Sequence, residues 1–189
     1  ARILLNLGLM NEHKSSIPSK GDEAIKNYEK AIKICKSNDV FDLHHRSLMA
    51  LGYFYALKVN DFAPAMQTYN NALEVAKRTE SRNEKMCETL LAKGNLLIKN
   101  GDFQSAKQAL KKAFKIKTSV ASDMEAIQKK FQIVSALCKY EDELVTTDSL
   151  DYVKRKELFE KLGDATCKVK NYEKAIDFYK KSLEAAVLN

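Results

Sequence analysis

Apolar residues recur along most of the chain at intervals of three and four positions, the spacing that places them on one face of an α-helix. Residues 101–116, GDFQSAKQALKKAFKI, show this pattern clearly, because Phe103, Ala106, Leu110 and Ala113 recur at helical spacing between lysines. Short polar turns separate such stretches. The pattern predicts an all-α protein with helices at about residues 1–14, 21–37, 39–58, 61–79, 81–99, 102–118, 122–145, 150–168 and 171–187.

Four of these stretches are related to one another. Residues 101–116 resemble SKGDEAIKNYEKAIKI at 19–34, NDFAPAMQTYNNALEV at 60–75 and KNYEKAIDFYKKSLEA at 170–185. Each follows a leucine-rich helix that contains one glycine, and each carries an alanine followed four positions later by Tyr or Leu. The glycines are Gly8, Gly52, Gly94 and Gly163, and the alanines are Ala24, Ala65, Ala106 and Ala175.

The recurring marks, L-G-x-x-Y in one helix and A-x-x-x-Y or A-x-x-x-L in the next, resemble the tetratricopeptide repeat, a helical hairpin of about 34 residues. Small residues at these positions allow the two helices of a hairpin to approach closely, and the Tyr or Leu fills the gap to the next hairpin. Such hairpins stack into a right-handed superhelical solenoid whose first helices line a binding groove. The resemblance therefore implies a solenoid of this type with one irregular helical insertion.

The spacing of the glycines predicts how the repeats are divided. Successive glycines lie 44, 42 and 69 residues apart, so one interval contains an additional segment. We expect three hairpins in residues 1–118, a degenerate repeat or an extra long helix with an acidic loop in 119–149, and a fourth hairpin in 150–189. The chain begins and ends in helical pattern without an initiator Met, which suggests a fragment of a longer chain.

Composition narrows the function. The chain has 189 residues, a net charge of +7, 45% hydrophobic residues and 30% charged residues, as expected for a folded domain rather than a disordered segment. No apolar run is long enough to cross a bilayer. The four cysteines are too far apart for a metal knuckle, and no phosphate loop or nucleophile motif is present. We expect buried, reduced thiols, no enzyme activity, no cofactor, no metal and no small-molecule substrate.

The candidate binding groove follows from the glycine positions. Side chains at offsets of about −6, −3, −2, +1 and +4 from each first-helix glycine are expected to face it. An amino-terminal half that is basic and amidic and a carboxy-terminal half that is acidic could orient an extended peptide; an ordinary solvated surface is the alternative. The candidate residues are Arg2, Asn6, Arg46, Met49, Tyr53, Asn95, Glu157, Glu160 and Asp164, with Glu12 and Lys161 at the same offsets.

A second candidate surface is basic. Residues 99–117 contain six lysines and one aspartate. Lysines at i, i+4 spacing form a stripe opposite the apolar face, where they could meet phosphates or an acidic partner, although no aromatic residues alternate with them as stacking platforms. A solubilising face is the alternative. This basic patch consists of Lys107, Lys111, Lys112 and Lys115.

Beyond the repeat pattern, the order of features resembles one family. ARILLNLGL at 1–9, the lysine-rich 101–116, the helix at 122–145 without repeat marks, and LFEKLGDATCKVKNYEKAIDFYKKSLEAA at 158–186 are similar to the Tonsoku-like family. That resemblance implies a nuclear scaffold of replication-coupled repair that binds core histones and joins a large helical partner to promote recombination at damaged forks. It also implies ankyrin and leucine-rich repeats, which this sequence does not contain.

Several functions remain open on the sequence alone. The first is a protein-interaction scaffold of chromatin and fork repair, with core histones, histone chaperones or a large repair subunit as partners and a nuclear location. The second is direct nucleic-acid binding through the basic patch. A third is a generic peptide-binding adaptor unrelated to repair, and a fourth is a continuous solenoid or dimer formed through exposed terminal helices. A chaperone-type clamp is disfavoured, since Leu5 and Leu9 occupy the places of its Lys and Asn.

Overall fold

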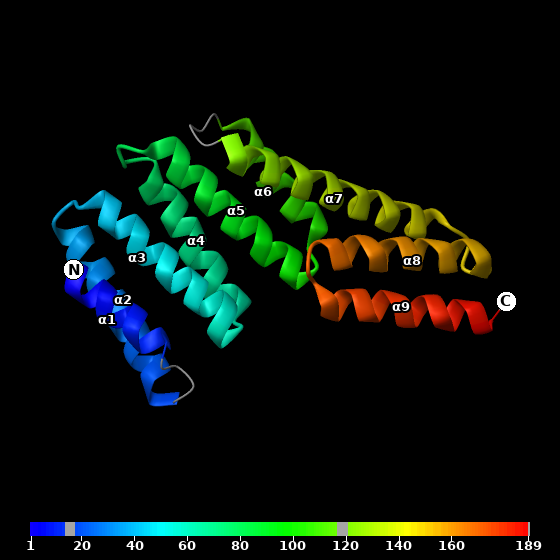
Figure 1. Ribbon diagram of the computed structural model, residues 1–189, viewed down its shortest axis with the longest axis horizontal. Coiled ribbons are helices and arrows are strands. Elements are labelled where there is room, and N and C mark those ends of the chain that lie inside the picture. The colour runs from blue at the N-terminus through cyan, green and yellow to red at the C-terminus, as the bar shows by residue number, and fades with distance from the viewer. Residues whose placement is uncertain (14–17, 117–120, 189) are drawn as a thin grey trace. The chain divides into compact units, whose positions relative to one another are not determined.

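The computed structural model describes residues 1–13, 18–116 and 121–188, and within these ranges the chain is helical without any strand (Figure 1). The predicted order of helices is confirmed, including one long helix in the irregular segment. The elements are α1 (Arg2–His13), α2 (Pro18–Ser37), α3 (Phe41–Phe54), the π-helical turn η1 (Tyr55–Val59), α4 (Phe62–Ala76), α5 (Arg82–Asn100), α6 (Phe103–Lys115), α7 (Ala121–Thr146), α8 (Tyr152–Lys168) and α9 (Tyr172–Val187).

The chain forms two compact units, and the boundary between them falls inside α5. Unit 1 contains Ala1–Leu96, with the pairs α1/α2 and α3/α4 side by side (Figure 1). Unit 2 contains Leu97–Phe114 and helices α7 to α9, with α8 packed against both α7 and α9. We call α1, α3, α5 and α8 the first helices of the hairpins and α2, α4, α6 and α9 the second helices.

The glycines of the first helices accommodate aromatic rings. In three hairpins a Cβ atom added at the glycine would lie 2.4 to 2.5 Å from a tyrosine ring carbon of the second helix, far inside van der Waals contact. The pairs are Gly8 with Tyr28, Gly52 with Tyr69 and Gly163 with Tyr179. The tyrosine therefore fills space within its own hairpin. The tyrosine can also contact the following hairpin. The Tyr28 ring meets the ring of Phe54 in α3 edge to face, with the ring centroids 6.3 Å apart.

The core of unit 1 lies between successive hairpins. One apolar cluster joins α1, α2 and α3, and a second joins α3, α4 and α5. The predicted alanines contribute to it with full burial, as expected for side chains at closely packed helix crossings. The first cluster contains Leu5, Ala24, Tyr28, Ala31, Leu51 and Phe54, and the second contains Leu48, Met49, Ala56, Ala65, Tyr69, Ala72, Ala92 and Leu96.

The turn within a hairpin uses a left-handed residue. Asn60, Gly101 and Lys170 have φ of 58°, 82° and 62°, and each lies two residues before the first residue of the second helix. This conformation ends a helix and reverses the chain. At the first of these turns the helix widens into η1, so the helix predicted over 39–58 is present as α3 followed by a π-helical turn. Helix α4 ends at Ala76 rather than at 79, because Arg78 and Thr79 form tight turns on Val75 and Ala76.

In unit 2 a buried asparagine connects α5 to α9. The Asn171 side chain donates to the carbonyl oxygens of Ile98 (2.7 Å) and Lys99 (3.1 Å), which lie in the last turn of α5. Its Oδ1 accepts from the Lys174 backbone N–H at 3.3 Å and so caps α9. One side chain therefore satisfies backbone groups at two helix ends. Part of the expected acidic loop is helical, since α7 continues to Thr146.

Candidate functional site

The first helices of unit 1 enclose a pocket of about 580 Å³, which we call the Arg46 pocket. Helix α1 contributes one side chain, α3 contributes five and α5 contributes two, so the pocket lies on the first-helix face predicted to bind ligands. The volume is within the range of small-molecule and peptide side-chain sites. The lining residues are Arg2, Asp42, Leu43, His45, Arg46, Met49, Lys85 and Glu88.

Charged groups surround the opening of the Arg46 pocket. Lys85 forms an ion pair with Asp42 across α3 and α5. Burial raises the pKa of the Glu88 carboxyl, and the nearby Lys85 opposes this shift only in part. Arg2 and Arg46 are exposed, and within the described ranges neither guanidinium has an ion pair or hydrogen bond. The pocket is therefore lined by the unpaired guanidiniums of Arg2 and Arg46, the Lys85–Asp42 ion pair and the carboxyl group of Glu88.

The floor of the pocket is a buried histidine. His45 is only 2% exposed, and its Nε2 lies 2.8 Å from Thr89 Oγ1. The Thr89 hydroxyl donates to the Lys85 carbonyl oxygen at 2.7 Å, which leaves its lone pairs free to accept from an Nε2–H. Burial lowers the pKa of His45 to about 4, so the imidazole is neutral at physiological pH. It is a structural group linking α3 to α5 and adds no charge to the pocket.

A smaller pocket of about 330 Å³ lies between α7 and α8 in unit 2, and we call it the Asp164 pocket. Asp164 Oδ1 accepts a hydrogen bond of 2.6 Å from the Tyr179 hydroxyl, which holds the carboxylate at its edge. Two lysines also line the pocket, so its surroundings are mixed in charge and not simply acidic. The lining residues are Gln132, Ile133, Ala136, Tyr140, Lys161, Asp164, Ala165 and Lys168.

The predicted groove residues fall into three groups. Arg2, Arg46 and Met49 meet in the Arg46 pocket, although Met49 is itself buried, and Asp164 lines the second pocket. Among the remaining candidates, Tyr53 packs edge to face on Tyr69 at 5.8 Å. The others are exposed and are not among the lining residues of either pocket; they are Asn6, Asn95, Glu157 and Glu160.

Local contacts of the acidic candidates limit what they can offer to a ligand. Glu157 pairs with Lys161 at 2.6 Å, one helical turn away. Glu160 lies 3.8 Å from Lys156 and accepts from the Ser182 hydroxyl at 3.3 Å, so it faces α9. Glu12, at the same offset series in α1, accepts from the buried Tyr28 hydroxyl at 2.8 Å. Each of these carboxylates therefore makes a contact within the protein, and a ligand would have to share the carboxylate with that contact.

Sequence reasoning missed five residues that line the Arg46 pocket: Asp42, Leu43, His45, Lys85 and Glu88. A signal was present for one of them. Glu88 stands six positions before Gly94, the same offset that relates Arg2 to Gly8 and Arg46 to Gly52. The other four lie seven to ten residues before the glycine of their own helix. The predicted groove positions began only six residues before each glycine, so these four residues were not considered.

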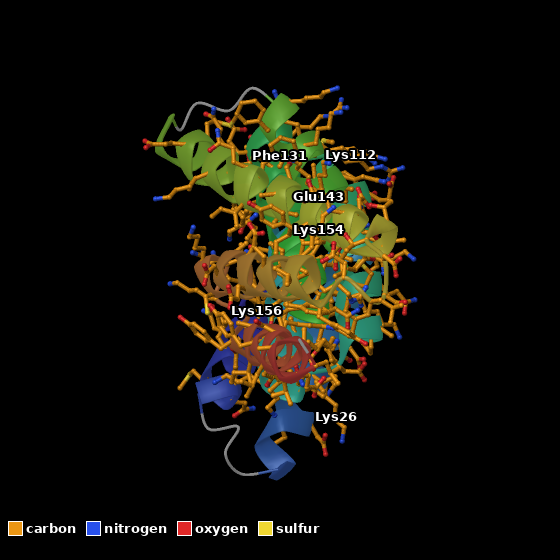
Figure 2. All side chains as sticks on the ribbon, turned by 90° about the vertical axis from the view of Figure 1, so that its right-hand side faces the viewer. Lys26, Lys112, Phe131, Glu143, Lys154 and Lys156 are labelled. Carbon is orange, nitrogen blue, oxygen red and sulfur yellow. The ribbon has the colours of Figure 1, made fainter. Side chains whose placement is uncertain are left out.

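The basic patch lies on α6. Lys111, Lys112 and Lys115 are exposed, and Figure 2 labels Lys112 among the side chains that extend from the ribbon. Lys107 is half-buried near Cys138 of α7, where its charge lowers the pKa of a thiol that burial raises. The patch therefore offers three open lysines and one partly covered one. Lys117, at the end of the predicted basic stretch, lies outside the described residues.

Both ends of the described chain expose apolar stripes. On α9 the stripe follows helical spacing and includes Tyr179, which is 39% exposed, whereas the corresponding Tyr28 and Tyr69 are buried by a following helix. On α1 three apolar side chains are exposed in the same way. The α9 stripe consists of Tyr172, Ile176, Tyr179, Leu183 and Val187, and the α1 stripe of Ile3, Leu7 and Met10.

Residues 1–13, 18–116 and 121–188 contain neither a metal-type cluster of side chains nor a helix that could span a membrane. In these ranges no three His, Cys, Asp or Glu side chains are grouped as a metal site would need. No helix in the same ranges has both the length and the apolar character required to cross a membrane. The cysteines are free thiols; Cys35, Cys87 and Cys138 are buried as expected, whereas Cys167 is half-buried.

Comparison with known proteins agrees with the repeat pattern. The tetratricopeptide repeat family matches residues 88–119. The chain is 46% identical over its whole length to a Tonsoku-like protein of Drosophila melanogaster and 29% identical over 98% of its length to one of Danio rerio. It spans about 13% of the length of these relatives. The structure resembles the apo form of RapI with a TM-score of 0.51 at 19% identity, covering 90% of this chain and 64% of that one.

These findings confirm the predicted all-α tetratricopeptide solenoid and the predicted Tonsoku-like resemblance. The RapI likeness supports the fold alone, because the identity is low. The relatives and the fold together support a protein-interaction scaffold, a role for which stacked helical hairpins are suited because their first helices present an extended surface.

Proposed function

Because this chain is a tetratricopeptide segment of Tonsoku-like type, we propose that it is a non-catalytic interaction module of a nuclear scaffold for chromatin and replication-fork repair. In this proposal the first-helix faces hold an extended segment of a protein partner, and the first partner to test is a core-histone amino-terminal tail. Histone chaperones and a large repair subunit are further partners of the same class. The relation to recombination at damaged forks rests on the family resemblance alone.

One observation carries the proposal: the Arg46 pocket lies on the first-helix face of unit 1, the Asp164 pocket lies where the first helix α8 meets α7, and each is lined by charged groups over an apolar floor. This combination suits a peptide, since the backbone and side-chain methylenes can cover the floor while charged ends pair at the rim. For a basic tail the relevant carboxylates are Asp164 at the second pocket and Glu160 nearby on α8.

The test is a titration of a labelled core-histone tail into this chain at about 50 and 200 mM salt, a range in which pure phosphate or surface-charge contacts weaken by orders of magnitude. We expect saturable binding that persists at the higher salt. Asp164→Asn is the sharper variant, because the amide oxygen can still accept from the Tyr179 hydroxyl while the charge is lost. We expect it to weaken tail binding and Glu160→Gln to weaken it further.

A matched control is Asp177→Asn. Asp177 is an exposed acid of the same α8/α9 hairpin but lies on the second helix, where it pairs with Lys181 at 3.0 Å. Tail binding that falls equally with Asp177→Asn would indicate a general charge effect. Absence of tail binding at either salt concentration would reject the histone part of the proposal and leave a different protein partner.

The exposed lysines of α6 support a second candidate, direct nucleic-acid binding. Lys111 and Lys112 could contact phosphates, and such binding would lose orders of magnitude over the same salt range. Titration of a short duplex DNA with and without Lys111→Gln/Lys112→Gln tests it. Loss of DNA binding in that double variant would favour the basic patch, and DNA binding unchanged by it would exclude the patch as the contact.

A further inference from the structure

We infer that the Arg46 pocket binds an acidic segment of a protein partner, with a carboxylate side chain of that partner held between Arg2 and Arg46. This inference rests on the proposed use of the first helices as a peptide-binding surface. The inference places an acidic partner on unit 1, whereas the proposed function places a basic histone tail on unit 2. An experiment can therefore reject one of these two binding sites without rejecting the other.

The position of the two arginines is the first argument. Each stands six residues before the glycine of its first helix, Gly8 in α1 and Gly52 in α3. Because α1 and α3 are in contact, equivalent positions on them lie on one face, and both side chains line the same pocket. Two guanidiniums from neighbouring helices can approach one carboxylate from two sides, with donors in the planar fork that suits it.

The balance of charge is the second argument. Three cations and two carboxylates line the pocket, and Lys85 and Asp42 neutralise each other. Glu88 is close to Lys85, whose charge acts on its pKa. The guanidiniums of Arg2 and Arg46 are left without a partner in the described part of the chain, and an added carboxylate is the group that complements them.

The floor is the third argument. Beneath the arginines lie Leu43, Met49 and the neutral ring of His45, all partly or fully buried. An apolar floor lowers the local dielectric, which strengthens a charge pair formed above it. It also accepts the methylene groups of a glutamate side chain, so that the carboxylate is presented to the arginines while its stem is buried.

The same geometry disfavours other occupants. A basic peptide would place its charge against two unpaired arginines. A nucleic acid would bring several phosphates to a pocket whose rim also carries Asp42 and Glu88, and the lining contains no exposed aromatic ring for a base to stack on. A single carboxylate, flanked by neutral residues, satisfies the arginines without meeting the two acids.

The experiment uses three labelled peptides of Gly and Ser with blocked termini that carry one central glutamate, glutamine or lysine, titrated by fluorescence anisotropy into this chain at about 100 mM salt. We expect the glutamate peptide to bind and the other two to bind at least tenfold more weakly. Arg46→Gln and Arg2→Gln are each expected to weaken the glutamate peptide about tenfold. Glu88→Gln is expected to tighten it several-fold, because it removes a like charge from the rim.

The control variant is Lys33→Gln, which makes the same charge change on the exposed face of the second helix α2. It should leave binding of the glutamate peptide unchanged. Circular dichroism of each variant verifies that the helices are retained. A charge reversal adds a positive readout: Arg46→Glu should lose the glutamate peptide and gain the lysine peptide.

The outcomes separate this inference from the proposed function. Equal binding of the glutamate and glutamine peptides, no binding of the glutamate peptide, or binding that neither arginine affects would each overturn the acidic-partner assignment. If the histone tail still bound through Asp164 in that case, the scaffold proposal would stand. If the glutamate peptide bound as expected and the tail did not, unit 1 would keep its acidic partner and the histone proposal would fail.

Discussion

The buried histidine of the Arg46 pocket makes the stability of unit 1 depend on pH. In the unfolded chain a histidine binds a proton with its ordinary pKa of about 6.5. In the folded chain burial lowers the pKa of His45 to about 4. Between these values the unfolded state binds more protons than the folded state, so the free energy of unfolding decreases as the pH is lowered.

The size of the effect follows from the two pKa values. Since one pKa unit corresponds to about 1.4 kcal/mol, His45 should cost about 2 kcal/mol of stability on going from pH 7.5 to pH 5, and about 3 kcal/mol at pH 4. Glu88 acts in the opposite direction, because burial raises the pKa of its carboxyl. The contribution of Glu88 cancels to first order when the parent chain is compared with a His45 variant, because both proteins contain Glu88.

The assay is urea unfolding followed by circular dichroism at several pH values between 7.5 and 5, with the parent chain and the His45→Gln variant. The amide of Gln can still donate to Thr89 and cannot be protonated in this range. We expect the variant to be less stable at pH 7.5 and to lose about 2 kcal/mol less than the parent by pH 5. In NMR the His45 ring should titrate near pH 4. Equal pH dependence of the two proteins would refute the reasoning.

Three further predictions concern packing, capping and thiol reactivity. Gly52→Ala places a Cβ 2.5 Å from a ring carbon of Tyr69 and should lower the free energy of unfolding in urea by about 1 to 3 kcal/mol. The loss should be smaller in a Tyr69→Leu background, because the ring is then absent. An equal loss in both backgrounds would contradict the packing of this ring over the glycine. Asn171→Ala removes two hydrogen bonds to α5 and the cap of α9, so unit 2 should lose about 1 to 3 kcal/mol by the same measurement, whereas Asn171→Ser should keep a cap for α9 and lose only the bonds donated to α5. Iodoacetamide should alkylate the half-buried Cys167 faster than Cys138, because Cys138 is buried and burial raises the pKa of its thiol. Mass spectrometry of the two cysteine peptides over time measures the order. Faster alkylation of Cys138 would contradict the described burial.

Local patterns were sufficient to predict most helices and the hairpin pairs. The spacing of apolar residues identified helices, and the pairs Gly52/Tyr69 and Gly163/Tyr179 were visible as repeat marks. Boundaries were less predictable. The π-helical turn before Asn60 and the early end of α4 depend on how the backbone carbonyls are satisfied at the turn, which apolar spacing does not report.

The candidate site was predictable only in part. Arg2 and Arg46 were found because an offset from the repeat glycine marks the same helix face in every hairpin. Lys85 and Asp42 were missed because they meet across α5 and α3, and the distance between two helices is set by the residues packed between them. The acidic candidates are exposed on α8, where Glu157 pairs with Lys161 at i, i+4 spacing within the helix, whereas the contact of Glu160 with Ser182 of α9 forms only when the two helices are assembled.

The sequence by itself determined the all-α class, the helical repeat and the Tonsoku-like resemblance, because helix propensity and apolar periodicity are properties of neighbouring residues in the chain. The tertiary structure decided which charges remain unpaired. Asp42 neutralises Lys85, Tyr179 holds Asp164, and the arginines of α1 and α3 have no partner in the described ranges. Electrostatic pairing depends on distance and burial, and residues more than forty positions apart in the chain acquire both only when the hairpins stack.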